Sequence, residues 1–123
     1  MPAFTKPSER TVAAFSAGVD KLDGVERRQM FGYPAAFLGG NMFICVFQDR
    51  IMVRLSPDDR MAALSLAGAR MFEPLPGRPM KEYVELPATI VAERAELDKW
   101  FRQAREYATA LPPKSAKKKK TPK

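Results

Sequence analysis

Three kinds of side chain in this sequence could do chemistry: a single cysteine, two close pairs of carboxylates, and a group of arginines near aromatic residues. The sequence contains no histidine, which removes the usual base of a serine or cysteine nucleophile and the commonest metal ligand. Cys45 lies between Ile44 and Val46 in an apolar run, so we expect a buried, unreactive thiol. We therefore predict a noncatalytic protein with no catalytic, cofactor-binding or metal-binding residues.

The two carboxylate pairs have structural interpretations. Asp58 and Asp59 follow Ser56 and Pro57, an order typical of the first turn of a helix, where acidic side chains are favourable. Glu82 and Glu85 are interpreted as solvent-facing residues of an edge strand. Neither pair predicts acid/base catalysis.

The arginines allow two interpretations. Arg27, Arg28 and Arg54 could share one surface of a sheet with Phe31 and Tyr33, as basic and aromatic groups do in proteins that bind single-stranded nucleic acid. Alternatively, Phe31 belongs to the core and the arginines are solvated. We favour the second interpretation, because the rest of the chain before residue 112 supplies no wider positive field.

The net charge of +7 is concentrated at the C-terminus. Residues 112–123 hold six lysines and no acid, whereas residues 1–111 hold 15 basic and 14 acidic residues. We expect a single α+β domain over residues 1–111 and a disordered tail over residues 112–123. The tail either makes nonspecific nucleic-acid contacts or only aids solubility; its candidate contacts are Lys114, Lys117, Lys118, Lys119, Lys120 and Lys123.

The apolar stretches are too short for a membrane span, since the longest is residues 42–47 and a spanning helix needs about 20 residues. The first residues lack the apolar region of a secretory signal. A lone cysteine agrees with a reducing compartment. We expect a cytoplasmic protein that does not bind membranes.

The N-terminal half predicts a helix followed by a meander of three strands. Ser8 can cap a helix that ends at Gly24, with one apolar stripe formed by Val12, Phe15, Val19 and Leu22. Residues 25–38 are interpreted as one irregular strand near an edge, because Gly32 and Pro34 interrupt it. Turns at residues 39–41 and 48–50 then join it to strands over residues 42–47 and 51–55.

Both of these later strands show alternating patterns. In the strand 42–47, simple alternation places Met42, Ile44 and Val46 on one face and Phe43, Cys45 and Phe47 on the other. Because both sets are apolar, we expect a central strand with both faces covered. The strand 51–55 alternates between Ile51, Val53 and Leu55 on one face and Met52 and Arg54 on the other, so we expect the first face to be less exposed to solvent.

The C-terminal half predicts a middle helix, two short extended pieces and a long helix. The middle helix begins at the cap Ser56 and ends at Gly68. The extended pieces, residues 71–72 and 80–86, are separated by prolines that prevent a continuous ladder. The last helix has an apolar stripe of Leu97, Phe101, Ala104, Ala108 and Leu111. The fold class is therefore α+β: a three-stranded antiparallel meander plus one or two further strands, flanked by N-terminal, middle and long C-terminal helices.

The string RRQMFGYPAAFLGGNMFICVFQDRIMVRLS, followed by FEPLPGRPMKEYVELP, resembles the N-terminal domain of the TfoX/Sxy family, bacterial regulators linked to competence for DNA uptake. The resemblance covers residues 26 to about 101, and its most specific residues are Arg28, Met30, Phe31, Gly32, Met42, Phe43, Met80, Tyr83 and Pro87. It implies a small α+β domain. It also implies a regulatory role, related to competence or transcription, in a single-domain member that lacks the second domain of the full-length regulators.

We therefore expect a regulatory or adaptor protein that acts through contact with a protein partner. The candidate surface comprises Arg27, Arg28, Gly32, Tyr33 and Arg54, where an irregular edge strand could accept another strand. Two alternatives stay open: a nucleic-acid accessory protein tethered by its lysine tail, and a small-ligand binder or enzyme. The latter would need a pocket between the sheet and the last helix, lined by Arg70, Glu73 and Tyr83. The sequence leaves a homodimer open.

Overall fold

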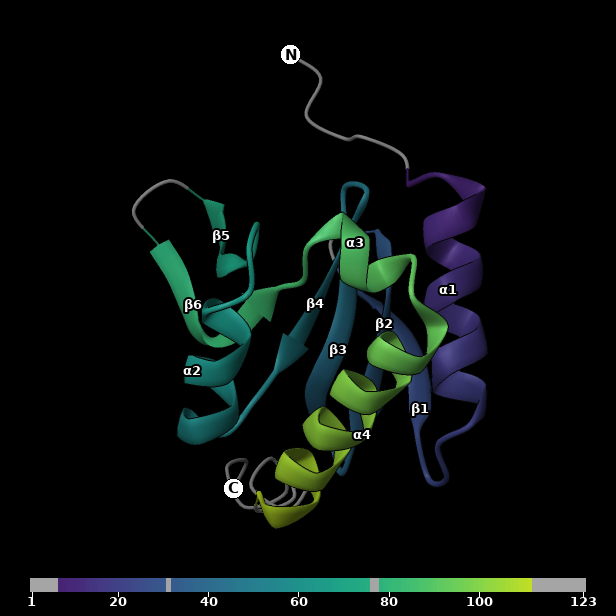
Figure 1. The fold of residues 1–123 in the computed structure, drawn as a ribbon. Coiled ribbons are helices and arrows are strands. Elements are labelled where there is room, and N and C mark those ends of the chain that lie inside the picture. The colour runs from purple at the N-terminus through teal and green to yellow at the C-terminus, as the bar shows by residue number, and fades with distance from the viewer. Residues whose placement is uncertain (1–6, 31, 76–77, 112–123) are drawn as a thin grey trace.

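A computed structural model describes residues 7–30, 32–75 and 78–111, which form one antiparallel sheet with helices on one side (Figure 1). The helices are α1 (Glu9–Asp20), α2 (Pro57–Leu64), α3 (Ala88–Val91) and α4 (Arg94–Ala110). The strands are β1 (Glu26–Met30), β2 (Tyr33–Leu38), β3 (Asn41–Phe47), β4 (Arg50–Arg54), β5 (Arg70–Leu75) and β6 (Arg78–Glu85). This architecture confirms the predicted fold class.

The strand order is β1-β2-β3-β4-β6-β5, with every neighbouring pair antiparallel. The predicted meander is β2-β3-β4, and three further strands extend it, one more than the larger number expected. The extra strand arises because residues 25–38 form the hairpin β1–β2; their interpretation as one irregular strand is wrong. Gly32, at a φ of +82°, supplies the left-handed backbone that turns the chain back.

The N-terminal helix caps and the turns lie where their residues predict, whereas α1 and α2 end at Asp20 and Leu64, four residues before the predicted ends at Gly24 and Gly68. Ser8 and Ser56 cap α1 and α2 by accepting hydrogen bonds from the main-chain N–H groups of Thr11 and Asp59. Gly39 and Gly40 have φ values of +61° and +82° and join β2 to β3, as expected for a hairpin turn with both central residues in the left-handed region.

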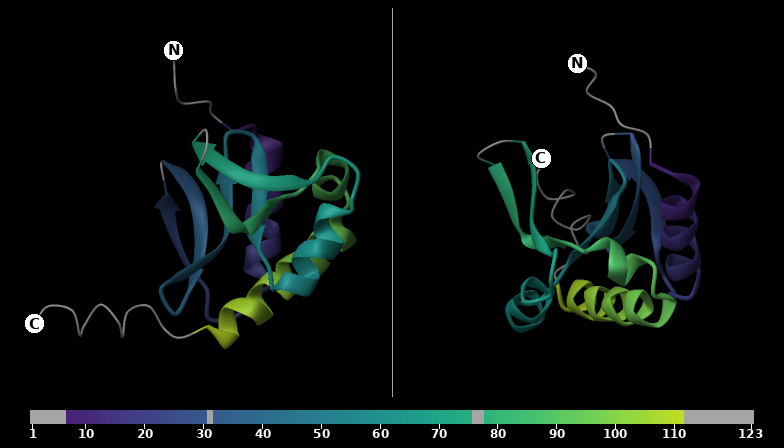
Figure 2. Two further views of the ribbon diagram at one scale, coloured as in Figure 1. Left: turned by 90° about the vertical axis from the view of Figure 1, so that its left-hand side faces the viewer. Right: turned by 45° about the horizontal axis from the view of Figure 1, so that its top comes forward.

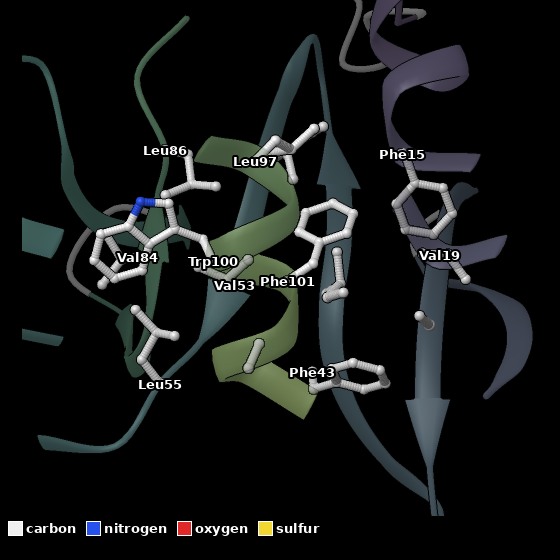
Figure 3. Close-up of a cluster of buried hydrophobic side chains, with 14 of the residues drawn as sticks. Phe15, Val19, Phe43, Val53, Leu55, Val84, Leu86, Leu97, Trp100 and Phe101 are labelled. Carbon is white, nitrogen blue, oxygen red and sulfur yellow. The ribbon is translucent and has the colours of Figure 1, made fainter. Parts of the chain in front are cut away.

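The core on the helix side of the sheet is formed by α1 and α4 packing over β2, β3, β4 and β6 (Figure 3). From α4, Leu97, Trp100 and Phe101 point at the sheet, and from α1, Phe15 and Val19 close the other side. The predicted stripe of α4 is confirmed, since its residues from Leu97 to Ala108 are buried. This layer supports the sheet whose strands and turns carry the candidate partner surface of Arg27, Arg28, Gly32, Tyr33 and Arg54.

The other side of the sheet, called the second face below, has its own buried cluster: Ala35, Met42, Cys45, Met52, Phe72 and Tyr83. The alternation predicted for β3 is wrong at its start, because Phe43 packs with Ile44 and Val46 on the helix side and Met42 packs with Cys45. The pairing shifts from Ala36↔Ile44 to Phe37↔Met42, which leaves Phe43 without an opposite residue. Such a bulge puts two consecutive residues on one face.

The β5–β6 hairpin stands away from the other strands (Figure 2, right). β6 pairs with β4 only from Tyr83 to Glu85, whereas its pairing with β5 continues out to Arg78. The register of this hairpin is interrupted twice between Met71 and Leu75, in line with the effect predicted for its prolines.

Candidate functional site

The β1–β2 hairpin carries four of the five residues predicted to contact a partner. Arg27 and Arg28 lie on β1, Gly32 in the turn and Tyr33 at the start of β2, whereas Arg54 is the last residue of β4. Because β2 and β3 separate β1 from β4, Arg28 and Arg54 lie three strand spacings apart across the sheet, about 14 Å, and Arg54 is two residues further along β4 than Met52, which lies in the row of Arg28. The structure therefore divides the predicted surface into a hairpin and a separate arginine.

Arg27 is directed toward the helix side. Its guanidinium forms an ion pair with Asp20 and donates a hydrogen bond of 3.3 Å to the main-chain carbonyl of Ser16, both on α1. The Arg27 side chain is still 42% exposed, so it fixes the start of β1 against α1 while part of its guanidinium faces water.

Arg28 is directed toward the second face. Its Nε lies 2.9 Å from a carboxylate oxygen of Glu26, and its guanidinium lies over the ring of Phe37, 5.2 Å from the centroid. Stacking on an aromatic ring holds a guanidinium flat and leaves its edge free to bind anions. Arg28 is 52% exposed, so its edge is accessible from solvent.

Tyr33 is buried, with 2% of its surface exposed, and its ring lies 5.2 Å from that of Phe47. This ring is the first of a series that continues through Phe47 and Phe72 to Tyr83. Tyr33 therefore supports the hairpin from within. It contributes less to an outer surface than the two arginines do.

Arg54 lies among side chains of three elements. Its guanidinium pairs with Glu82 at 2.6 Å and lies 5.6 Å and 6.0 Å from the ring centroids of Tyr83 and Tyr107. Only 21% of its side chain is exposed. Arg54 thus ties β4 to β6 and α4, and does not form one contiguous basic patch with Arg27 and Arg28.

Sequence reasoning missed a second arginine cluster, in which Glu85 pairs with Arg50 at 2.5 Å and with Arg70 at 3.3 Å. The interpretation of Glu85 as a solvent-facing residue of an edge strand is wrong, because β6 is an inner strand and Glu85 is 7% exposed. The pairing of β4, β6 and β5 brings these residues together, and local sequence does not determine the register of three strands. Glu85 and Arg70 end a row of directly opposed residues that crosses the whole sheet: Arg28, Ala35, Cys45, Met52, Glu85 and Arg70.

Cys45 lies in the middle of this row and is fully buried. Burial raises the pKa of its thiol to about 12, so the thiol stays protonated at neutral pH, as predicted from its apolar neighbours. Among residues 7–30, 32–75 and 78–111, no three His, Cys, Asp or Glu side chains come together as a metal site would require.

The remaining predicted sites divide into two groups. The six tail lysines lie outside the described residues, as does the side chain of Glu73. The lining predicted for a pocket between the sheet and α4 is wrong, because Tyr83 lies on the second face. A pocket at the end of α4 is lined instead by residues of α4, of β2 and of the turns that contain Asp23 and Gly39. In the described part of the chain, no helix is both long and apolar enough to cross a membrane.

Searches of curated proteins and of solved structures found no match. A family model described as the TfoX N-terminal domain matches residues 17–108, which is most of the chain and includes every described strand. This chain is therefore a member of the TfoX N-terminal domain family.

Proposed function

We propose that this protein is a noncatalytic regulatory module that binds a partner protein by pairing an extended segment of that partner with the outer side of β1. Family membership supports a regulatory, competence-type role at the level of the family. The observation that carries the proposal is the position of β1. It pairs with β2 at five positions from Glu26 to Met30, and it is the last strand on its side of the sheet.

An edge strand has main-chain N–H and C=O groups that face away from its neighbour and can pair with another strand. β1 is the outermost strand of its hairpin in Figure 2 (left). Its residues from Glu26 to Gln29 are all exposed. The edge predicted at Gly32 to Pro34 is thus replaced by Glu26 to Met30, since β2 is an inner strand.

The charges on β1 indicate the chemistry of the partner. Arg27 and Arg28 point to opposite sides of the sheet, and both remain about half exposed. A partner strand with acidic residues at consecutive positions would place one carboxylate beside each guanidinium. Cross-strand pairs of opposite charge stabilise a sheet, and like charges directly opposite destabilise it.

The same rule disfavours a second copy of this chain as the partner. An antiparallel register that pairs all five residues of β1 with a second β1 places Arg28 opposite the Arg28 of the other copy. This repulsion is typical of edges that resist self-association. We therefore infer a different protein with an acidic extended segment.

A site-specific crosslink tests this proposal. Gln29 is exposed on β1, and the native Cys45 is buried with a raised thiol pKa, so a photocrosslinker can be attached selectively to a Gln29→Cys variant. In nuclease-treated lysate we expect an adduct that maps to an acidic segment of one protein. The control position is Ser65→Cys, since Ser65 is exposed at the end of α2.

Charge reversal provides the matched comparison. Arg27→Glu together with Arg28→Glu should abolish the adduct, whereas the same reversal at Arg94 and Arg102, which are exposed on α4, should preserve it. An adduct that survives reversal on β1, or that forms equally well at Ser65→Cys, would contradict the proposal.

The second candidate function, nucleic-acid binding through the tail, rests on the six lysines between residues 112 and 123. Each phosphate contact with a single strand contributes a slope of about 0.7 in the logarithm of the affinity against that of salt. Replacing all six lysines by glutamine should then remove DNA binding at low salt. Equal affinity of the wild type and of this six-glutamine variant for DNA would exclude the tail as the site of DNA contact.

A further inference from the structure

A pocket of about 360 Å³ lies where the start of α1, the β3–β4 turn and α3 meet. These three segments come together near the top of Figure 1. A volume of this size falls within the range of small-molecule sites. None of the lining residues belongs to β1 or β2, so the pocket is independent of the proposed partner edge.

Part of the pocket wall is apolar. It is formed by Leu86, which is 2% exposed, and by Val91, Ala88 and Ala92 from α3 and its end. Leu86 and Val91 also pack against the core on the helix side of the sheet. This wall is therefore firmly supported and can cover a small apolar group.

The rest of the wall is polar and carries two cations. Arg10 from α1 and Arg50 from β4 line it, together with the hydroxyl-bearing residues Ser8 and Thr11. Asp49 is the acidic residue of the lining, so the lining has a net charge of +1. This charge favours an anionic ligand.

Arg50 is held in place from behind. Its Nη1 lies 2.5 Å from the buried carboxylate of Glu85, which also pairs with Arg70. Half of the Arg50 side chain remains exposed, so donors that do not face Glu85 can contact a ligand. A guanidinium fixed in this way loses little conformational freedom when an anion binds.

The negative charge of Asp49 is already engaged. Its carboxylate accepts a hydrogen bond of 2.8 Å from the main-chain N–H of Ser8 at the start of α1. This bond is the main reason why the pKa of Asp49 lies below its usual value, and the side chains of Thr11 and Ser8 and the charge of Arg10 lower it as well. Asp49 thus anchors α1 to the β3–β4 turn, and Arg10 and Arg50 are the cationic groups of the lining that can contact an anion.

We propose that this pocket binds a small organic anion whose oxyanion head contacts Arg10 and Arg50 and whose short apolar body lies on the wall formed by Leu86 and Val91. Guanidinium groups bind both carboxylates and phosphates through paired, charge-assisted hydrogen bonds. The head is therefore either a carboxylate or a phosphate monoester.

NMR titration of the ¹⁵N-labelled full chain tests the proposal and distinguishes the two heads. Benzoate, phenyl phosphate and inorganic phosphate are added at constant ionic strength, and the amide signals of Ser8, Thr11 and Ala88 are followed. We expect saturable shifts with benzoate or phenyl phosphate, and about fivefold weaker binding of inorganic phosphate because it lacks the apolar body. No saturable shift with either aromatic probe up to about 20 mM would overturn the proposal.

Three variants locate the binding. Arg10→Gln should lower the affinity for the aromatic probe by about fivefold or more. Ala88→Phe, at an exposed position on α3, should block the pocket without disturbing the core. Arg94→Gln is the control, because Arg94 is an exposed arginine outside the pocket lining. Equal affinity of the wild type and Arg10→Gln, or equal losses in Arg10→Gln and Arg94→Gln, would overturn the proposal.

Discussion

The hydroxyl group of Tyr83 on β6 donates a hydrogen bond of 2.7 Å to the main-chain carbonyl of Met42 on β3. The strand β4 lies between them in the sheet, so one side chain links strands that do not pair directly. Tyr83 is 7% exposed, and its ring also lies beneath the guanidinium of Arg54. This residue therefore joins the projecting β5–β6 hairpin to the centre of the second face.

Tyr83→Phe should lower the free energy of unfolding by about 1–2 kcal/mol, because the Met42 carbonyl loses a buried hydrogen bond. Urea denaturation of the two proteins measures the difference. Tyr107→Phe is the control, since Tyr107 is a less buried tyrosine on α4. Equal losses in both variants would show that the link to Met42 contributes nothing specific.

Alkaline pH should destabilise the fold through Cys45 and Tyr83. Burial raises the thiol pKa of Cys45 from 9.0 to about 12 and the phenol pKa of Tyr83 from 10.0 to about 12. As the pH rises, the unfolded chain loses these protons before the folded chain does. The contribution of the two groups to the free energy of unfolding is therefore fully present below pH 9 and decreases as the pH rises toward 12. Urea unfolding between pH 8 and pH 11 measures this slope, and Cys45→Ala should flatten its first part; an unchanged slope in that variant would contradict the assignment.

Local sequence predicted most elements of this fold because caps and turns depend on neighbouring residues. Ser56 followed by Pro57 specifies the start of α2, and Gly39 with Gly40 specifies the β2–β3 turn, whatever the rest of the chain does. Two features could not be predicted from local sequence. The bulge at Phe43 depends on how β2 pairs with β3. The hairpin turn at Gly32 was not predicted because Gly32 and the nearby Pro34 are equally compatible with a single interrupted strand.

The candidate sites were less predictable than the fold, since they depend on contacts between distant residues. Arg27 and Arg28 are neighbours in sequence and both lie on β1, but they point to opposite sides of the sheet. Arg54 could be placed relative to them only once the strand order was known. The association of Glu85 with Arg50 and Arg70 joins residues 35 and 15 positions apart in sequence. No local periodicity encodes such a contact.

Gly18→Ala should destabilise the protein although alanine favours helices. A Cβ atom at Gly18 would lie 2.5 Å from Cδ2 of Phe101, at the contact between α1 and α4. Overpacking of this kind costs about 1–3 kcal/mol, more than the roughly 1 kcal/mol that alanine gains in a helix. The free energy of unfolding of Gly18→Ala should be partly restored by Phe101→Leu in the same chain, and additive losses in the double variant would argue against the close contact.

Replacing Glu85 should lower the free energy of unfolding more than replacing Arg70, one of the two arginines that pair with it. Glu85→Gln removes both ion pairs and leaves two guanidiniums that are at least half exposed. Because these can return to water, the loss should be about 2 kcal/mol, below the 3–5 kcal/mol of a fully buried pair. Arg70→Gln should cost less than about 1 kcal/mol, since Arg50 still neutralises the buried carboxylate. Urea denaturation of both variants measures the two losses, and an Arg70→Gln loss as large as that of Glu85→Gln would mean that Arg50 alone cannot balance the charge of Glu85.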